Sequence, residues 1–171
     1  MKNTFQYVLG FMLCITMLCE TALSSENQFI VMSEGATDIS VVFGKTALFI
    51  KIITHEKDIG KPSDGWPKKR LTSCTYSRYP CSLVDSIGII VNDKELFLPR
   101  SIYSDLADIS TAEISMKQGQ FILTLRVGDA SESYTTKIYF DNIKVHKRKV
   151  FNNFDGQLMQ ETIYYSSLIM D

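Results

Sequence analysis

Alternation between apolar and polar residues is the feature of this sequence that most restricts its fold. Residues 120–127 place Phe121, Leu123, Leu125 and Val127 on one face and Gln120, Ile122, Thr124 and Arg126 on the other. Residues 133–140 repeat the pattern, with one face formed by Tyr134, Thr136, Ile138 and Phe140. A period of two is that of a β-strand with one buried face, whereas a helix would repeat every three or four residues. Two such strands in succession predict an antiparallel pair.

The rest of the chain carries the same signals over shorter stretches. We expect further strands over residues 28–32, 39–43, 46–53, 87–91, 95–98, 143–151 and 161–166. Hairpin turns are expected at Asn92-Asp93-Lys94 and at Asp141-Asn142, because Asn and Asp tolerate the left-handed backbone of tight turns. Seven or eight closely spaced strands predict a mainly β fold, either an antiparallel sandwich or a barrel-like meander.

One short helix is expected after Pro99. Ser101 is placed to cap it, and Ile102 and Leu106 recur four residues apart before the pattern decays near Ser110.

Residues 1–24 have the layout of a cleaved secretory signal peptide. Lys2 gives a positive start, residues 7–19 are almost continuously apolar, and small residues precede a cut after Ser24. The apolar stretch is too short to span a bilayer comfortably, and a buried helix or a retained anchor is the alternative. We therefore expect a periplasmic or secreted protein without a stable membrane anchor, whose single mature domain comprises residues 25–171.

Export also decides how the four cysteines are used. Cys14 and Cys19 leave with the signal peptide, so the mature chain keeps Cys74 and Cys81. An even number of cysteines in an oxidising compartment predicts a disulfide, and two free buried thiols are the alternative. Zinc binding by this pair is disfavoured, because no histidine lies nearby and the spacing is not that of a zinc site. We expect no metal and no cofactor.

Few residues of the chain point to catalysis. The sequence contains none of the motifs of serine hydrolases, zinc peptidases, phosphate-binding loops or dinucleotide-binding folds. His55 and His146 are the only histidines, and a structural role fits each better than that of a catalytic base. A formal net charge of −1 excludes a general basic coat for nucleic acid. We therefore favour a protein that is not an enzyme and has no nucleic-acid partner.

A long segment without strand signals, at about residues 55–83, carries the expected disulfide. Residues 57–81 contain the only tryptophan, three of the four prolines, and six basic residues against two acidic ones. Loops of this length are usually functional or disordered, and Trp, Tyr and Arg are the side chains that anchor interfaces. The alternative is a solvated loop whose tryptophan packs back onto the core. As a binding loop it would use Trp66, Lys68, Lys69, Arg70, Tyr76, Arg78 and Tyr79.

A second basic segment spans residues 144–149. On a strand, one face would carry Lys144, His146 and Arg148, and the other Lys147 and Lys149. Such a stripe suits an anionic partner, whereas lysines on an edge strand protect against aggregation. We favour the edge-strand interpretation, because Glu161 on the next expected strand is placed to pair with these cations.

Residues 128–140, GDASESYTTKIYF, and residues 161–165, ETIYY, carry a Gly-Asp turn before a Ser-Tyr strand and a closing Thr-Tyr strand. In these features the chain resembles uncharacterised exported proteins of bacteria, over about the C-terminal half from Ile87 onward. The resemblance implies the bacterial periplasm or cell surface as the compartment. It implies no activity, cofactor or substrate.

Two classes of function remain open. A non-catalytic binding module, of the type of immunity proteins or periplasmic enzyme inhibitors, would use the loop to hold a protein partner such as a toxin or an envelope enzyme. A small-ligand carrier or an envelope enzyme would instead need a pocket within the sandwich or barrel. The aromatic and basic loop favours the first class, and no sequence feature fixes the oligomeric state.

Overall fold

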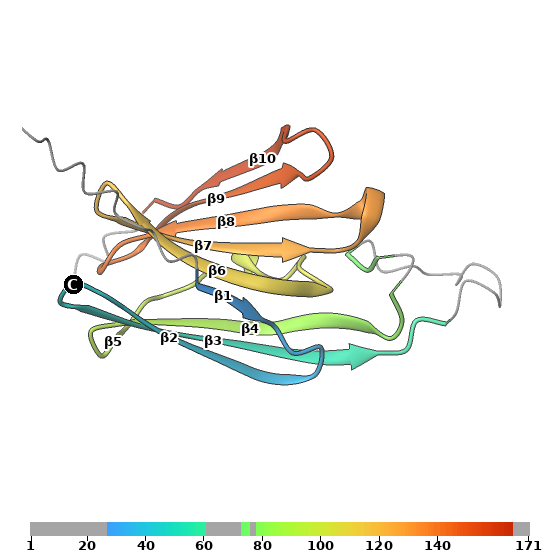
Figure 1. Ribbon diagram of the computed structural model, residues 1–171, viewed down its shortest axis with the longest axis horizontal. Helices are drawn as coiled ribbons and strands as arrows, with labels where there is room; N and C mark the ends of the chain where they lie inside the picture. Colours follow the sequence, from blue (N-terminus) through green and yellow to red (C-terminus); the bar gives the residue numbers. More distant parts are fainter. Residues whose placement is uncertain (1–26, 61–72, 76–77, 166–171) are drawn as a thin grey trace, which may run out of the picture.

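The computed structural model describes residues 27–60, 73–75 and 78–165 (Figure 1). The expected signal peptide, residues 1–24, lies outside this part. So do five of the expected loop residues, namely Trp66, Lys68, Lys69, Arg70 and Tyr76. The described part is mainly β, as predicted, and none of its helices is long and apolar enough to cross a membrane.

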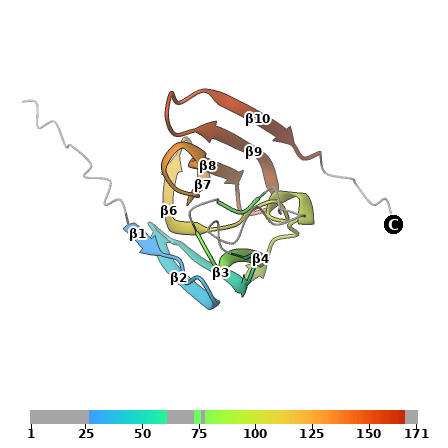
Figure 2. The same cartoon turned by 90° about the vertical axis from the view of Figure 1, so that its right-hand side faces the viewer.

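Ten strands of the described chain form two antiparallel sheets, which face each other as the layers of a sandwich (Figures 1 and 2). The four-stranded sheet consists, in order, of β2 (Gly35–Phe43), β3 (Thr46–Lys57), β4 (Cys81–Val91) and β5 (Lys94–Glu95). The six-stranded sheet consists, in order, of β1 (Asn27–Ile30), β6 (Ile109–Lys117), β7 (Gln120–Val127), β8 (Tyr134–Phe140), β9 (Val145–Asn152) and β10 (Leu158–Ile163).

The chain crosses between the two layers twice. It begins with β1 at the edge of the six-stranded sheet, crosses to form β2 to β5 as consecutive neighbours, and returns through residues 96–108 to form β6 to β10. The return segment carries the 3-10 turn η2 (Arg100–Ile102). Ile102 and Leu106 from this segment are buried in the core and help to close the space between the layers.

The core lies between the facing sides of the two sheets. Alternate residues of β7 and β8, among them Leu123 and Ile138, are fully buried and share one hydrophobic cluster with Ile50 and Ile89 of the other layer. Phe121 of β7 joins the layers, because its ring lies 5.7 Å from that of Phe43 on β2 and 5.6 Å from that of Phe140 on β8. The long strands β2, β3, β4, β6, β7, β8 and β9 therefore each give one side to the core, whereas β5 and β10 contain no buried residue.

The strongest sequence signals are confirmed. The two alternating stretches form β7 and β8, which pair along their whole length. The turn between β4 and β5 places Asn92 and Asp93 at φ values of 47° and 64°, the left-handed conformation predicted for it.

Where the sequence signals are weaker, the structure differs from the prediction at one strand, one turn and one helix. The strand β6 was not predicted, because Ser, Thr, Ala and Glu interrupt its apolar positions. The expected two-residue turn at Asp141-Asn142 is a longer connection, residues 141–144, in which neither residue adopts a positive φ. The expected helix after Pro99 is a single 3-10 turn without a side-chain cap from Ser101.

Candidate functional site

The loop between β3 and β4 is closed at its base by a disulfide. β3 ends at Lys57 and β4 begins at Cys81, so the connection comprises residues 58–80. The predicted bond between Cys74 and Cys81 is confirmed, with the two Cα atoms 5.7 Å apart. Both cysteines are buried and pack against Ala107 on the return segment.

Asp108 holds the two residues that follow the cysteines. Its carboxylate is buried, and the two oxygens accept hydrogen bonds from the backbone N–H of Thr75 at 2.8 Å and of Ser82 at 2.9 Å. Its carbonyl oxygen accepts from the backbone N–H of Gly128 at 3.1 Å and from the guanidinium of Arg78 at 3.2 Å. One residue thus ties the loop base to the start of β4 and the end of β7.

The backbone around this clamp has little space for side chains. Gly128 has a φ of +73°, and a Cβ atom there would lie 2.8 Å from the carbonyl oxygen of Glu132 and 3.2 Å from Oγ1 of Thr75. Asp108 itself has a φ of 54°, in the left-handed region that Asp tolerates better than most residues. The Gly-Asp turn at 128–129 is therefore part of the packing around the loop base.

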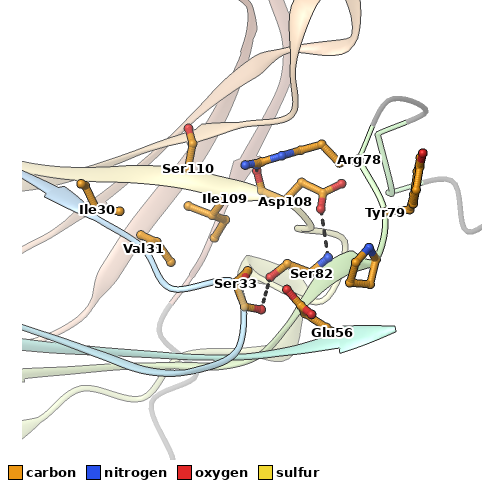
Figure 3. Close-up of a pocket in the computed structure, with 11 residues that line it drawn as sticks. Ile30, Val31, Ser33, Glu56, Arg78, Tyr79, Ser82, Asp108, Ile109 and Ser110 are labelled. Carbon is orange, nitrogen blue, oxygen red and sulfur yellow. Dashed lines mark hydrogen bonds between the residues drawn. The ribbon is translucent and has the colours of Figure 1, made fainter. Parts of the chain in front are cut away.

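A pocket of about 590 Å³ opens beside the clamp, at the end of the sandwich that carries the loop (Figure 3). Opposite charges line it, from Glu56 at the end of β3 and Arg78 of the loop base. The exposed side chains of Ile30 and Tyr79 add apolar surface. Ser82 anchors the floor, where its hydroxyl donates to the carbonyl oxygen of Ser33 at 2.6 Å. A concave surface with mixed charge and exposed apolar groups is suited to receive a side chain of another protein.

Sequence reasoning found part of this site. The structure brings Arg78 and Tyr79 into the pocket, while the other five loop residues lie outside the described part. The sequence did not single out Asp108 or Ile30 as residues of this site, and both lie far from the loop along the chain. It also did not single out Glu56, which lies two residues before the connection. No sequence signal marked Asp108, because β6, the strand that begins after it, was itself not predicted.

The basic side chains of residues 144–149 do not all lie on the faces of the strand that the sequence predicts. Arg148 is buried, because a register shift at the start of β9 turns it toward the core on the same side as Val145. The expected alternation, with Arg148 on the face of Lys144 and His146 and opposite Val145, is therefore wrong at this bulge. Lys147 and Lys149 point outward, and their Nζ atoms lie 3.8 Å and 3.2 Å from Oε1 of Glu161.

The buried Arg148 pairs with exposed polar groups of the return segment. One guanidinium nitrogen donates to the carboxylate of Asp105 at 3.0 Å and to the carbonyl oxygen of Ser101 at 3.4 Å, while Nε has no partner among the described residues. Burial, followed by the nearby charge of Asp105, raises the pKa of Tyr134 to about 12 against the opposing effect of Arg148. Tyr134 is therefore a neutral phenol at physiological pH.

Each histidine is held by an aspartate. Nδ1 of His55 lies 2.7 Å from Oδ1 of Asp85, and Nε2 of His146 lies 2.7 Å from Oδ2 of Asp141. Neither contact includes a serine or cysteine nucleophile, which the triad arrangement would require. Among the described residues, no three His, Cys, Asp or Glu side chains gather as a metal site.

Comparisons of the chain with protein-family models, with curated proteins and with solved structures found no match.

Proposed function

We propose that this protein is an exported, non-catalytic binding module that holds a partner protein at the loop end of the sandwich. The observation that carries the proposal is the double closure of the loop base, by the Cys74–Cys81 disulfide and by the carboxylate of Asp108. A closed base reduces the conformational freedom that a loop loses on binding, and this lowers the entropic penalty of association.

The pocket beside the loop supports the same surface. Ile30 is 82% exposed although it is a large aliphatic residue, and Tyr79 is 44% exposed. Arg78 is already oriented by the carbonyl oxygen of Asp108, and Glu56 supplies the opposite charge. Exposed apolar groups surrounded by charges are typical of protein interfaces. The loop residue Trp66 would add the anchor that binding loops commonly use.

The proposed compartment is the periplasm or the exterior of a bacterium. A disulfide is compatible with an oxidising compartment, and the resemblance of the C-terminal half to exported bacterial proteins favours the same location. In this compartment the partner would be a delivered toxin or an envelope enzyme that the module blocks, in the manner of an immunity protein or an inhibitor.

Site-specific photo-crosslinking tests the proposed surface. A photoreactive amino acid replaces Ile30 in the pocket or, as a matched control, Phe97 beside β5, since these side chains are 82% and 84% exposed. We expect position 30 to give a saturable crosslink to one envelope protein, which an excess of unlabelled protein suppresses. Position 97 follows β5 by two residues, and β5 lies at the end of the molecule opposite the loop (Figure 1), so position 97 should give none.

Trp66→Ala provides the second arm of this test. At a central anchor the substitution should weaken capture by about 2 kcal/mol without changing the unfolding transition. Equal crosslinking from both positions, no saturable crosslink at all, or full capture by Trp66→Ala would overturn the proposal.

A further inference from the structure

A second pocket, of about 470 Å³, lies on the outer side of the six-stranded sheet. Its lining residues come from β6, β7, β8 and β9 and from the turn before β10. Because these side chains point away from the core, the sheet itself separates the pocket from the core. Its volume falls within the range of roughly 300–1,000 Å³ typical of small-molecule sites.

Strand register determines which side chains form this surface. Thr124 lies between the fully buried Leu123 and Leu125 and therefore points outward. Its register partners are Glu113 on β6 and Lys137 on β8, and Lys137 in turn is the partner of Lys149 on β9. In the adjacent row, Arg126, Thr135 and Phe151 are register partners. The two rows place cations at the centre of the outer surface.

Two of these cations have no counter-ion in the described part of the chain. Lys149 is paired with Glu161 at 3.2 Å, whereas Lys137 and Arg126 form no ion pair with a described residue. Lys137 also lies directly across from Lys149, and like charges in register destabilise a sheet. An anionic ligand between Arg126 and Lys137 would relieve this repulsion.

The other polar groups of the pocket are mainly free donors. Thr124 is only 9% exposed, and it lines the pocket. The side-chain oxygens of Asn152 and Asn153 accept from the backbone N–H of Phe154 at 2.7 Å and from the hydroxyl of Thr135 at 2.6 Å. The side-chain NH₂ groups of both asparagines are thus available as donors. The pocket therefore favours a ligand rich in acceptor oxygens.

The pocket also offers one apolar face. Phe151 is half-buried, with Nζ of Lys137 5.7 Å from the centre of its ring. A pyranose ring presents C–H groups on its faces and hydroxyl oxygens at its edges, and a uronic acid adds a carboxylate. We propose that this pocket binds an acidic saccharide, with its carboxylate between Arg126 and Lys137 and a sugar ring against Phe151. This site is independent of the loop and of the function proposed above.

A nucleic-acid strand fits the surface less well. In the row that contains Lys137 and Lys149, Glu113 lies on one side of these cations and Glu161 on the other. A polymer with one negative charge per nucleotide would meet these carboxylates, whereas a short saccharide contacts only the central cations.

Titration of the ¹⁵N-labelled protein with a galacturonic acid trimer, followed by NMR, tests the proposal. We expect saturable shifts at the backbone amides of residues 124–126, 135–137 and 151–153. Arg126→Gln and Lys137→Gln should each weaken binding about tenfold, because each removes a charged donor. Lys94→Gln on β5 removes an exposed cation from the other sheet and should leave the affinity unchanged. The spectra of the free variants show whether each remains folded.

Three further ligands separate the sources of binding. Maltotriose, a neutral trimer, inorganic phosphate and a short oligothymidylate should each bind much more weakly than the acidic trimer. The proposal is overturned if the acidic trimer causes no saturable shift, or if Lys94→Gln weakens trimer binding as much as Arg126→Gln and Lys137→Gln do. It is also overturned if any of the three other ligands binds as tightly as the acidic trimer at these residues.

Discussion

Asp108 shows how one buried carboxylate can organise a surface loop. Both of its oxygens are occupied by backbone N–H groups, from Thr75 and Ser82, the residues that follow the two bonded cysteines. A carboxylate can satisfy two such donors at once, whereas any neutral side chain of the same size supplies a single acceptor oxygen. The choice of residue at this position therefore follows from the number of donors that meet there.

The substitution Asp108→Asn tests this role. Asn keeps the shape and tolerates the left-handed backbone, but its amide group faces one N–H donor that then has no acceptor. We expect the free energy of unfolding, measured in urea, to fall by about 1–3 kcal/mol. Asp129→Asn is the control, because the exposed Asp129 accepts a single hydrogen bond, from Ala130, that Asn can also accept. Equal losses in both variants would contradict the clamp.

Arg148 is a second buried charge, with less complete pairing. Its side chain is 3% exposed, while that of its partner Asp105 is 52% exposed and shares its charge with solvent. Arg148→Met removes the buried charge and keeps most of the apolar stem, so stability should be equal or higher. Asp105→Asn leaves the cation with a weaker partner and should lower the free energy of unfolding by about 1 kcal/mol.

The double variant makes this comparison decisive. In the Arg148→Met background, Asp105→Asn should have no effect on urea unfolding, because the charge that it stabilises is gone. A larger loss from Arg148→Met than from Asp105→Asn would show that the pair is net stabilising.

At the scale of elements, turns decide where strands end. Gly119, between β6 and β7, and Gly128, after β7, have similar φ values of +77° and +73°. An added Cβ meets nothing within 4 Å at Gly119 but lies 2.8 Å from the Glu132 carbonyl oxygen at Gly128. Gly119→Ala should therefore reduce stability by about 1 kcal/mol through backbone conformation alone, and Gly128→Ala by clearly more. Thermal unfolding of the two variants measures the difference, and equal shifts would exclude a steric role for the Glu132 contact.

The turn between β8 and β9 gives a pH-dependent contribution. Desolvation raises the pKa of Asp141, but hydrogen bonds from the N–H groups of Lys144 and Ile143, together with His146, outweigh it and hold the pKa below its usual value. Because the folded pKa lies below the unfolded one, the contribution is complete above the unfolded pKa of about 3.9 and is lost as the pH falls through the folded pKa.

Asp141→Asn removes this dependence while keeping an acceptor oxygen. The variant should be less stable than wild type by about 1 kcal/mol at pH 7, and the two should converge in urea titrations as the pH falls below 4. A difference that persists at the lowest pH would assign the effect to turn geometry rather than to charge.

Strand periodicity carried more information than residue propensity. β7 and β8 were predictable because, apart from Thr136, every second residue is large and apolar or aromatic, so that the pattern alone identifies the buried face. β6 was not, since its buried positions include Ala112, whose burial depends on neighbours from β1 and β7. The bulge at the start of β9 likewise depends on pairing, and it reversed the expected orientation of Arg148 relative to Val145.

At the scale of the whole molecule, the disulfide stabilises one end of the sandwich. The ring between Cys74 and Cys81 is short, so its closure contributes about 2–3 kcal/mol in the chain-entropy model. Thiol labelling of the native protein should give no reaction at these cysteines before reduction and two reactive groups after it. Reduction should expose the loop base to proteolysis at protease concentrations that leave the strands intact. Free labelling before reduction would contradict the bond in the native protein.

The candidate site depends on tertiary contacts that the sequence does not display. Cysteine number and composition identified the loop, the disulfide, Arg78 and Tyr79. Ile30 and Asp108 reach the same pocket from β1 and from the segment before β6, and their approach follows from the pairing of those strands. The same limit applies to the outer pocket, whose cations come from β7 and β8 and meet only through register.

The position of β1 sets an order on folding. Residues 27–30 pair with residues 111–114 of β6, although the strands between them belong to the other sheet. During synthesis from the N-terminus, β1 therefore has no partner until β6 has been made, whereas β2, β3 and β4 can pair with near neighbours. Closure of the first strand is consequently a late, long-range event. Under the export that we propose, this delay would favour passage across the membrane before the sandwich closes.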